Sequence, residues 1–219
     1  MHVCLNTEFR TMSPRHPNTE STTPSTSRPA WVLPTAGLAG LAVGAAAAAL
    51  LWKGLRNPPI PPTVEPVRGW DIQRYMGRWY EVARIDHSFE KGLERTQAEY
   101  TQLPDGTVHV LNRGYDARHR RWKSSEGKAR TVHGPDVAAL KVSFFGPFYG
   151  GYNVVALDAE YRWAMVVGSD LRYFWILSRT PELADGVAAR LLAQARLLGV
   201  PVDKVQWILQ DGVNPTGSW

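Results

Sequence analysis

Apolar and polar side chains alternate in short runs between residues 68 and 211, and this period of two predicts β-strands. In one run, Leu140, Val142 and Phe144 are separated by two polar residues, so one face of the strand is apolar. Residues typical of tight turns stand between the runs, as in Pro104-Asp105-Gly106-Thr107. We predict strands at about 78–86, 95–103, 107–115, 121–132, 137–145, 151–157, 161–168 and 172–178.

Eight consecutive strands with short connections predict an all-β fold, an eight-stranded antiparallel up-and-down barrel. The interior of a barrel of that size is just wide enough for one small ligand.

One segment after the predicted strands has the period of an α-helix rather than a strand. Its apolar residues form a single stripe, made of Leu183, Val187, Leu191, Ala195 and Leu198. Thr180 suits the N-cap, Pro181 the first helical position and Gly199 the end of the helix. We therefore predict one C-terminal helix packed on the outside of the barrel. Residues 205–209 alternate again and predict a last short strand or an extended tail.

The first third of the chain has a different organisation. Residues 1–28 are rich in Ser, Thr, Pro and Asn and predict a disordered segment. Residues 29–53 predict a single hydrophobic helix, either a transmembrane anchor or a cleaved signal segment, because no charged residue occurs from Pro29 to Trp52. Residues 54–67 form a Pro-rich linker that would act as a spacer. The predicted barrel domain spans residues 68–211, and a short C-terminal tail, 212–219, follows it.

The charge of the chain and its cysteine and histidine content limit the partners and sites that we expect. The net charge is +5, but residues 1–62 hold five basic and two acidic residues, so the rest of the chain carries only +2. This near-balance argues against nucleic acid as a partner of the folded part. The single cysteine, Cys4, excludes a disulfide within the chain and a thiolate metal cage. The six histidines lack the spacing of a helical metal site, so we expect no metal and no cofactor.

Two segments about a hundred residues apart suggest the first and last strands of the barrel. They are Gly77-Arg78-Trp79-Tyr80 and Trp175-Ile176-Leu177-Ser178-Arg179. A large indole can fill the narrow end of a barrel, and a guanidinium can lie across its ring face. A barrel filled at one end and open at the other is a cup, which favours binding over chemistry.

Together with Asp158-Ala159-Glu160-Tyr161, these segments resemble the three signature regions of the lipocalins. The likeness covers about residues 68–211. Ser125–Ala129 and Ala139–Val154 look like the bacterial outer-membrane branch in particular, whose relatives include apolipoprotein D. The signature positions in this chain are Gly77, Trp79, Tyr80, Asp158, Tyr161 and Arg179.

The resemblance implies a cup that binds fatty acids or lysophospholipids and stores or transports them for envelope maintenance. It also implies a membrane-anchored protein of the bacterial cell envelope, in the outer membrane, with its barrel in the periplasm. Bacterial members are usually acylated on a cysteine that follows a signal peptide. No cysteine follows residues 29–53 here, so a transmembrane helix would replace the acyl anchor.

Several residues are candidates for the site. We predict a ligand-binding lining of aromatic side chains from five strands: Tyr115, Phe144, Tyr152, Trp163, Tyr173 and Trp175. The segment 145–151 is either a glycine-rich turn or an apolar rim that contacts lipid or a second protomer of a homodimer. The polar strand 121–130 is either a solvated face or a headgroup site.

Two other functions remain open at this stage. A few lipocalins isomerise or de-epoxidise their ligand, and Glu81, His109 and Glu126 are the titratable residues to test for such an enzyme. The aromatic content also permits a tetrapyrrole or another pigment. No catalytic motif is present in the sequence, so we expect no catalytic residue.

Overall fold

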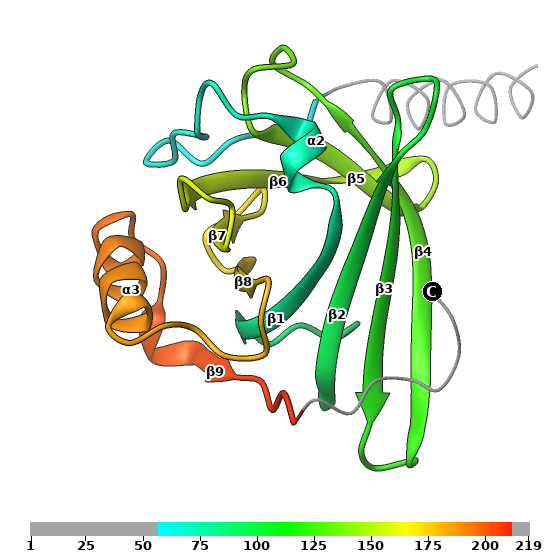
Figure 1. The fold of residues 1–219 in the computed structure, drawn as a ribbon, viewed down its shortest axis with the longest axis vertical. Helices are drawn as coiled ribbons and strands as arrows, with labels where there is room; N and C mark the ends of the chain where they lie inside the picture. Colours follow the sequence, from blue (N-terminus) through cyan, green and yellow to red (C-terminus); the bar gives the residue numbers. More distant parts are fainter. Residues whose placement is uncertain (1–56, 212–219) are drawn as a thin grey trace, which may run out of the picture.

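The structure, a computed structural model, describes residues 57–211 (Figure 1). The predicted disordered segment 1–28, the hydrophobic segment 29–53 and the C-terminal tail 212–219 lie outside the described residues, as does Cys4. Within the described part of the chain, no helix is long and apolar enough to cross a membrane.

A closed antiparallel barrel forms the body of the described chain. Its strands are β1 (Gly77–Ile85), β2 (Leu93–Gln102), β3 (Val108–Asp116), β4 (Arg121–Thr131), β5 (Ala139–Phe145), β6 (Phe148–Leu157), β7 (Trp163–Val167) and β8 (Phe174–Ser178). Each strand pairs with the next along the chain, and β1 pairs with both β2 and β8, which closes the barrel. The predicted eight-stranded up-and-down barrel is therefore confirmed. A short strand, β9 (Val205–Trp207), adds to the end of β1.

Alternation along the strands sorts the buried side chains into two clusters on opposite faces of the sheet. The inner cluster fills the barrel and comprises Trp70, Tyr75, Trp79, Ala98, Tyr100, Val108, Val110, Ala129, Ala138, Leu140, Val154, Tyr161, Ala164, Val166 and Leu177. The outer cluster includes Val82, Ala83, Ile85, Val155, Ala156, Met165, Val167, Phe174, Ile176, Val187, Leu191 and Ala195. The inner cluster is the candidate site, and the outer cluster holds the helix.

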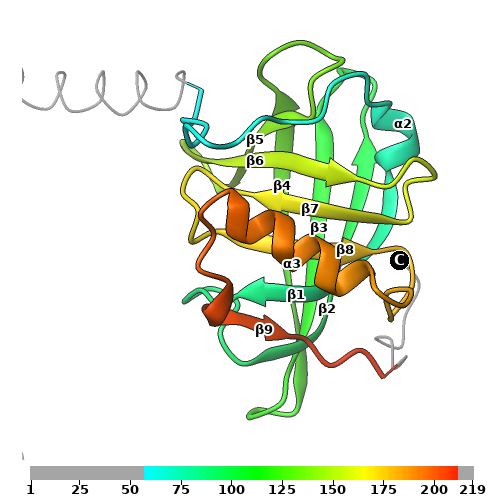
Figure 2. The same ribbon diagram turned by 90° about the vertical axis from the view of Figure 1, so that its left-hand side faces the viewer.

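The C-terminal helix α3 (Val187–Leu197) packs on the outside of the barrel, across β7 and β8 (Figure 2). Its predicted start at Pro181 is wrong. Gly186, the N-cap residue, has a left-handed backbone with φ of 74°, which interrupts the helix. Thr180 donates from Oγ1 to the carbonyl of Glu182 at 2.6 Å, so it closes a local turn instead. The predicted apolar stripe is buried at Val187, Leu191 and Ala195.

A four-residue helix, α2 (Ile72–Tyr75), was not predicted, because one turn is too short to show a helical period. Asp71 caps it by accepting from the backbone N–H of Gln73 at 2.8 Å. The residues before it also belong to the folded unit. Val64 is buried in the outer cluster, and the amide of Val67 donates to Val154. The end of the expected linker therefore packs on the barrel.

Candidate ligand-binding site

One end of the barrel is closed by the indole ring of Trp79, on which the guanidinium of Arg179 stacks. Trp79 is fully buried, and the guanidinium carbon of Arg179 lies 3.9 Å from the centre of its ring. Arg179 also donates to the backbone carbonyls of Arg78 at 2.7 Å and Arg74 at 2.8 Å. The Trp79 Nε1 donates to the carbonyl of Tyr75 at 2.8 Å, which ties the strand to α2. This is the arrangement that the sequence led us to expect for positions 79 and 179.

The other signature residues lie around the same end. Gly77 opens β1 close to Arg179, whose Nη1 would be 3.5 Å from a Cβ at that position. The hydroxyl of Tyr161 accepts from the Asp71 amide at 2.6 Å. Asp158 is bound by Arg162 at 2.7 and 2.9 Å, which lowers the pKa of the carboxyl. Tyr80 points to the other face and packs against the outer cluster.

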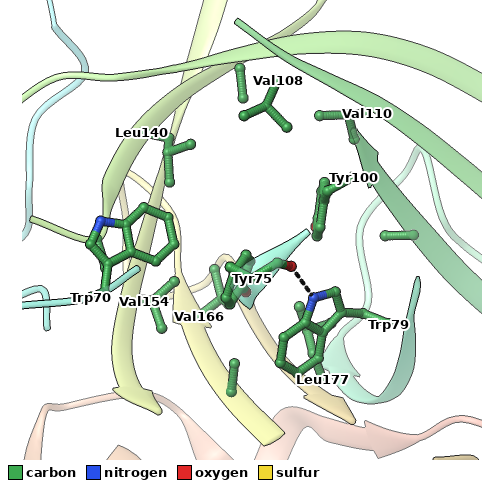
Figure 3. Close-up of a cluster of buried hydrophobic side chains, with 14 of the residues drawn as sticks. Trp70, Tyr75, Trp79, Tyr100, Val108, Val110, Leu140, Val154, Val166 and Leu177 are labelled. Atoms are coloured by element: carbon green, nitrogen blue, oxygen red, sulfur yellow. Dashed lines mark hydrogen bonds between the residues drawn. The ribbon is translucent and has the colours of Figure 1, made fainter. Parts of the chain in front are cut away.

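A small cavity lies inside the inner cluster, next to the closed end. Its volume is about 20 Å³, which is the space of one water-sized group. Figure 3 shows Tyr75 in the middle of this cluster, between Trp70 and Trp79, with Tyr100 beside it. The cavity is lined by Trp70, Tyr75, Met76, Tyr100, Val108, Ala129, Leu140, Val142 and Tyr152. A long ligand must therefore displace side chains as it enters.

Of the six predicted lining residues, three belong to the interior. Tyr152, Phe144 and Trp175 pack against the inner cluster, and Tyr152 lines the cavity itself. Tyr173 lies at the open end, 38% exposed, with its ring centre 4.1 Å from that of His87.

The other two predicted lining residues are on the outside of the barrel. Tyr115 alternates with the inward Val108 and Val110, and its ring contacts Arg95 and Trp122. Trp163 packs against the outer cluster, and Arg190 of α3 lies over its ring at 5.5 Å. Their prediction as lining residues is corrected, because a period of two shows that a strand has two faces without showing which face is inside.

The inner face of β4 runs from the cavity to the open end. Ala129, Gly127 and Ser125 share this face, because β4 keeps an unbroken register with β3. Ala129 is buried in the inner cluster, whereas Ser125 is exposed. The Phe144 ring lies over Gly127, where an added Cβ would be 2.8 Å from it. Phe144 therefore stands between the cavity and the open end.

The inner wall opposite carries a buried ionic cluster that sequence analysis did not predict. Arg84 donates from Nη1 to Glu81 at 2.8 Å and from Nη2 to the backbone carbonyls of Glu90 and Leu93. Trp175 donates from Nε1 to the Glu90 carboxyl at 3.1 Å. Burial raises the pKa of Glu90 to about 8, and nearby Glu81 adds to this shift. The cluster ties the β1–β2 loop to the barrel wall.

The three titratable residues proposed for an enzyme do not form one site in the structure. His109 and Glu126 pair at 3.3 Å on the outer face of β3 and β4. Glu81 lies inside and is held by Arg84. On the polar strand β4, Lys123 pairs with Asp116 at 2.6 Å, and Lys123 and His119 lower the pKa of this carboxyl.

Large aromatic side chains are exposed at the open end. Phe145 is 77% exposed, Phe148 59% and Phe89 62%. They come from the β5–β6 turn and the β1–β2 loop. Two tyrosines are partly exposed as well, Tyr149 at the start of β6 and Tyr173 just before β8. Exposed basic residues accompany them at the open ends of the strands, namely Lys91, Arg118, Arg120, Arg121 and Arg172. We call these aromatic and basic residues the rim.

The chain is similar to several known proteins, in sequence and in fold. A family model described as a lipocalin-like domain matches residues 70–210. The outer membrane lipoprotein Blc of Escherichia coli strain K12 is 51% identical over 170 residues, which cover 78% of this chain and 96% of that protein. Temperature-induced lipocalin-1 of Arabidopsis thaliana is 35% identical over 71% of this chain and 87% of its own length. Insecticyanin from the tobacco hornworm Manduca sexta, 21% identical, has a similar fold, with a TM-score of 0.56 over 69% of this chain and 87% of that chain.

Proposed function

The chain belongs to the lipocalin family, and we propose that its barrel binds one lipid, a fatty acid or a lysophospholipid. The lipid would be stored or transported for maintenance of the cell envelope. The observation that carries this proposal is the polarity of the interior, which is apolar around the cavity and open and polar along β4. An acyl chain fits the first part and a headgroup the second.

Burial of the acyl chain would drive binding. Each buried CH₂ contributes about 0.8 kcal/mol, against the cost of ordering the lipid. Because the cavity is small, Phe144 and the flexible Met76 must move to make room for the chain. Lys123 and the exposed Ser125 lie along the open part of β4, where a headgroup would remain in contact with water.

We also propose that the protein is located at a membrane. The relatives named outer membrane lipoprotein support a location in the bacterial cell envelope, in the outer membrane, with the barrel in the periplasm. The rim supports contact between the open end and an anionic lipid surface, because it combines exposed aromatic rings with basic side chains. We assign the rim to the bilayer rather than to a second protomer.

The two alternatives have weaker support. An enzyme on this scaffold would need an acid and a base in one place, and His109 and Glu126 lie on the face opposite Glu81. The described residues show no contact that favours a pigment, and an absorbance spectrum of the purified protein tests this alternative directly. We therefore propose binding without covalent chemistry.

A pair of neighbouring serines on β4 gives the sharpest test. Ser125 and Ser124 are both exposed, but Ser125 faces the interior and Ser124 the outside. A fluorescent fatty acid is titrated into the full-length protein, the Ser125→Trp variant and the Ser124→Trp variant. We expect Ser125→Trp to weaken binding by about tenfold or more, because the indole fills the route to the cavity, while Ser124→Trp binds like the wild type. Equal affinities in all three proteins, or no binding by the wild type, would contradict the proposal.

A further inference from the structure

Three tyrosine hydroxyls meet inside the barrel and form what we call the hydroxyl triad: Tyr75, Tyr100 and Tyr152. The Tyr152 hydroxyl lies 2.7 Å from that of Tyr75 and 3.1 Å from that of Tyr100. They come from α2, β2 and β6, elements far apart in the sequence. All three side chains line the cavity, whose other lining residues are apolar.

The triad has one more hydrogen-bond donor than it uses. Three hydroxyls carry three O–H donors, and the two contacts between them use two. Among the described residues, no other protein group lies within hydrogen-bond distance of these hydroxyls. An unused donor in an apolar interior is costly, so the triad favours an oxygen acceptor in the adjacent cavity.

The surroundings select a neutral acceptor. Burial raises the pKa of each of the three phenols, so all of them remain neutral hydroxyls. Arg179, a cation at this end of the barrel, lies across the Trp79 ring and donates its N–H groups to backbone carbonyls. A carboxylate or phosphate would have no cation to pair with at the triad, whereas a hydroxyl or carbonyl needs none.

We propose that the hydroxyl triad recognises a neutral oxygen group at the far end of the lipid chain, such as a terminal hydroxyl. This inference rests on the proposed function, in which the charged headgroup stays at the open end and the tail enters first. The far end of the chain then reaches the cavity, and its oxygen bonds to the triad. The protein would prefer ω-oxygenated acyl lipids over plain ones.

The test compares two ligands that differ by one hydroxyl. Palmitic acid and ω-hydroxypalmitic acid are titrated calorimetrically into the full-length protein. We expect the hydroxylated acid to bind about tenfold more tightly, the effect of one hydrogen bond gained in an apolar site. In the triple variant Tyr75→Phe/Tyr100→Phe/Tyr152→Phe, which removes every donor of the triad, the preference should fall to about twofold or less. A second measurement keeps the test independent of that variant's folding: ω-methoxypalmitic acid, whose ether oxygen can only accept, should also bind the wild type more tightly than palmitic acid does.

Tyr115→Phe is the matched control, because its side chain lies on the outside of the barrel, where the ring contacts Arg95 and Trp122. It should keep the full preference. If the wild type binds both acids equally well, the triad holds water rather than ligand and the inference is wrong, while lipid binding itself stands. If the preference survives in the triple variant, or if the wild type does not prefer the ether to palmitic acid, the triad is not the donor and the inference is also wrong. If the wild type binds neither acid, the proposed function fails and the inference falls with it.

Discussion

The inner and outer clusters lie on opposite faces of the same strands but are built from different side chains. The outer cluster is mainly aliphatic and packs against α3, a fixed partner within the chain. The inner cluster contains five large aromatic residues, among them Tyr75 and Tyr100, and surrounds the cavity. Aliphatic packing is sufficient on the outer face, because α3 is a permanent part of the fold. On the proposed function, the interior carries hydroxyls and the Phe144 ring because its partner is a ligand.

The largest effect should come from the outer cluster and should leave binding intact. Leu191 of α3 is fully buried there. We expect Leu191→Ala to lower the free energy of unfolding by about 3 kcal/mol, since it leaves a cavity under the helix. Urea unfolding measures the loss, and a fatty-acid titration at low temperature should return the wild-type affinity. A matching loss of affinity would show that the two clusters are not independent.

The next largest loss of stability should come from a substitution at the closed end of the barrel. Arg179→Ala removes the cation over Trp79 and the two hydrogen bonds to the Arg78 and Arg74 carbonyls. We expect a loss of about 2 kcal/mol in the free energy of unfolding. Arg172→Ala is the control, because this arginine is exposed at the open end and should change stability by less than about 0.5 kcal/mol. Equal unfolding midpoints for the two variants would show that the contact of Arg179 with Trp79 does not stabilise the closed end.

Phe144 should affect the rate of entry more than the stability. Its side chain is only partly buried, so Phe144→Ala should cost about 1 kcal/mol, less than a fully buried ring. Without the ring over Gly127, the route to the cavity is open, and stopped-flow fluorescence should show faster uptake of a fatty acid. Phe145→Ala, the exposed neighbour, should leave the rate unchanged. An unchanged rate in Phe144→Ala would mean that the ligand enters elsewhere.

The last prediction concerns the pH dependence of stability rather than stability or binding at one pH. The pKa of Glu90 is about 8 in the folded protein, above its ordinary value of 4.5. The folded state therefore binds this proton more tightly than the unfolded chain, and the stability that it contributes is lost as pH rises from about 4.5 through 8. We expect the free energy of unfolding of Glu90→Gln to fall less than that of the wild type over this range. Glu126→Gln, an exposed carboxylate, should keep the wild-type slope.

The sequence was sufficient for the barrel and for its closed end. The period of two and the turn residues located all the barrel strands to within a few residues. The Trp79 and Arg179 pair was found because its chemistry requires an indole and a guanidinium at the two ends of the sheet.

The faces of individual strands could not be predicted, because bulges shift the register. Shifts occur between Glu81 and Ala83 and between Val154 and Ala156, and each reverses the alternation beyond it. Tyr115 and Trp163 were assigned to the wrong face for a simpler reason. Their strands alternate regularly, and a period of two does not show which of the two faces is inside. The sequence did not predict the buried ionic cluster of Arg84 and Glu90, for another reason. Charged residues are expected at the surface, and only the folded structure brings these two together inside the barrel.

Native mass spectrometry of the full-length protein can show whether the barrel interior receives one acyl lipid. The protein is purified without detergent, stripped of bound lipid and mixed with palmitic acid. We expect a species with one fatty acid per chain, present in Ser124→Trp and strongly reduced in Ser125→Trp. A wild-type spectrum without any bound fatty acid, or equal occupancy in the two serine variants, would contradict this expectation.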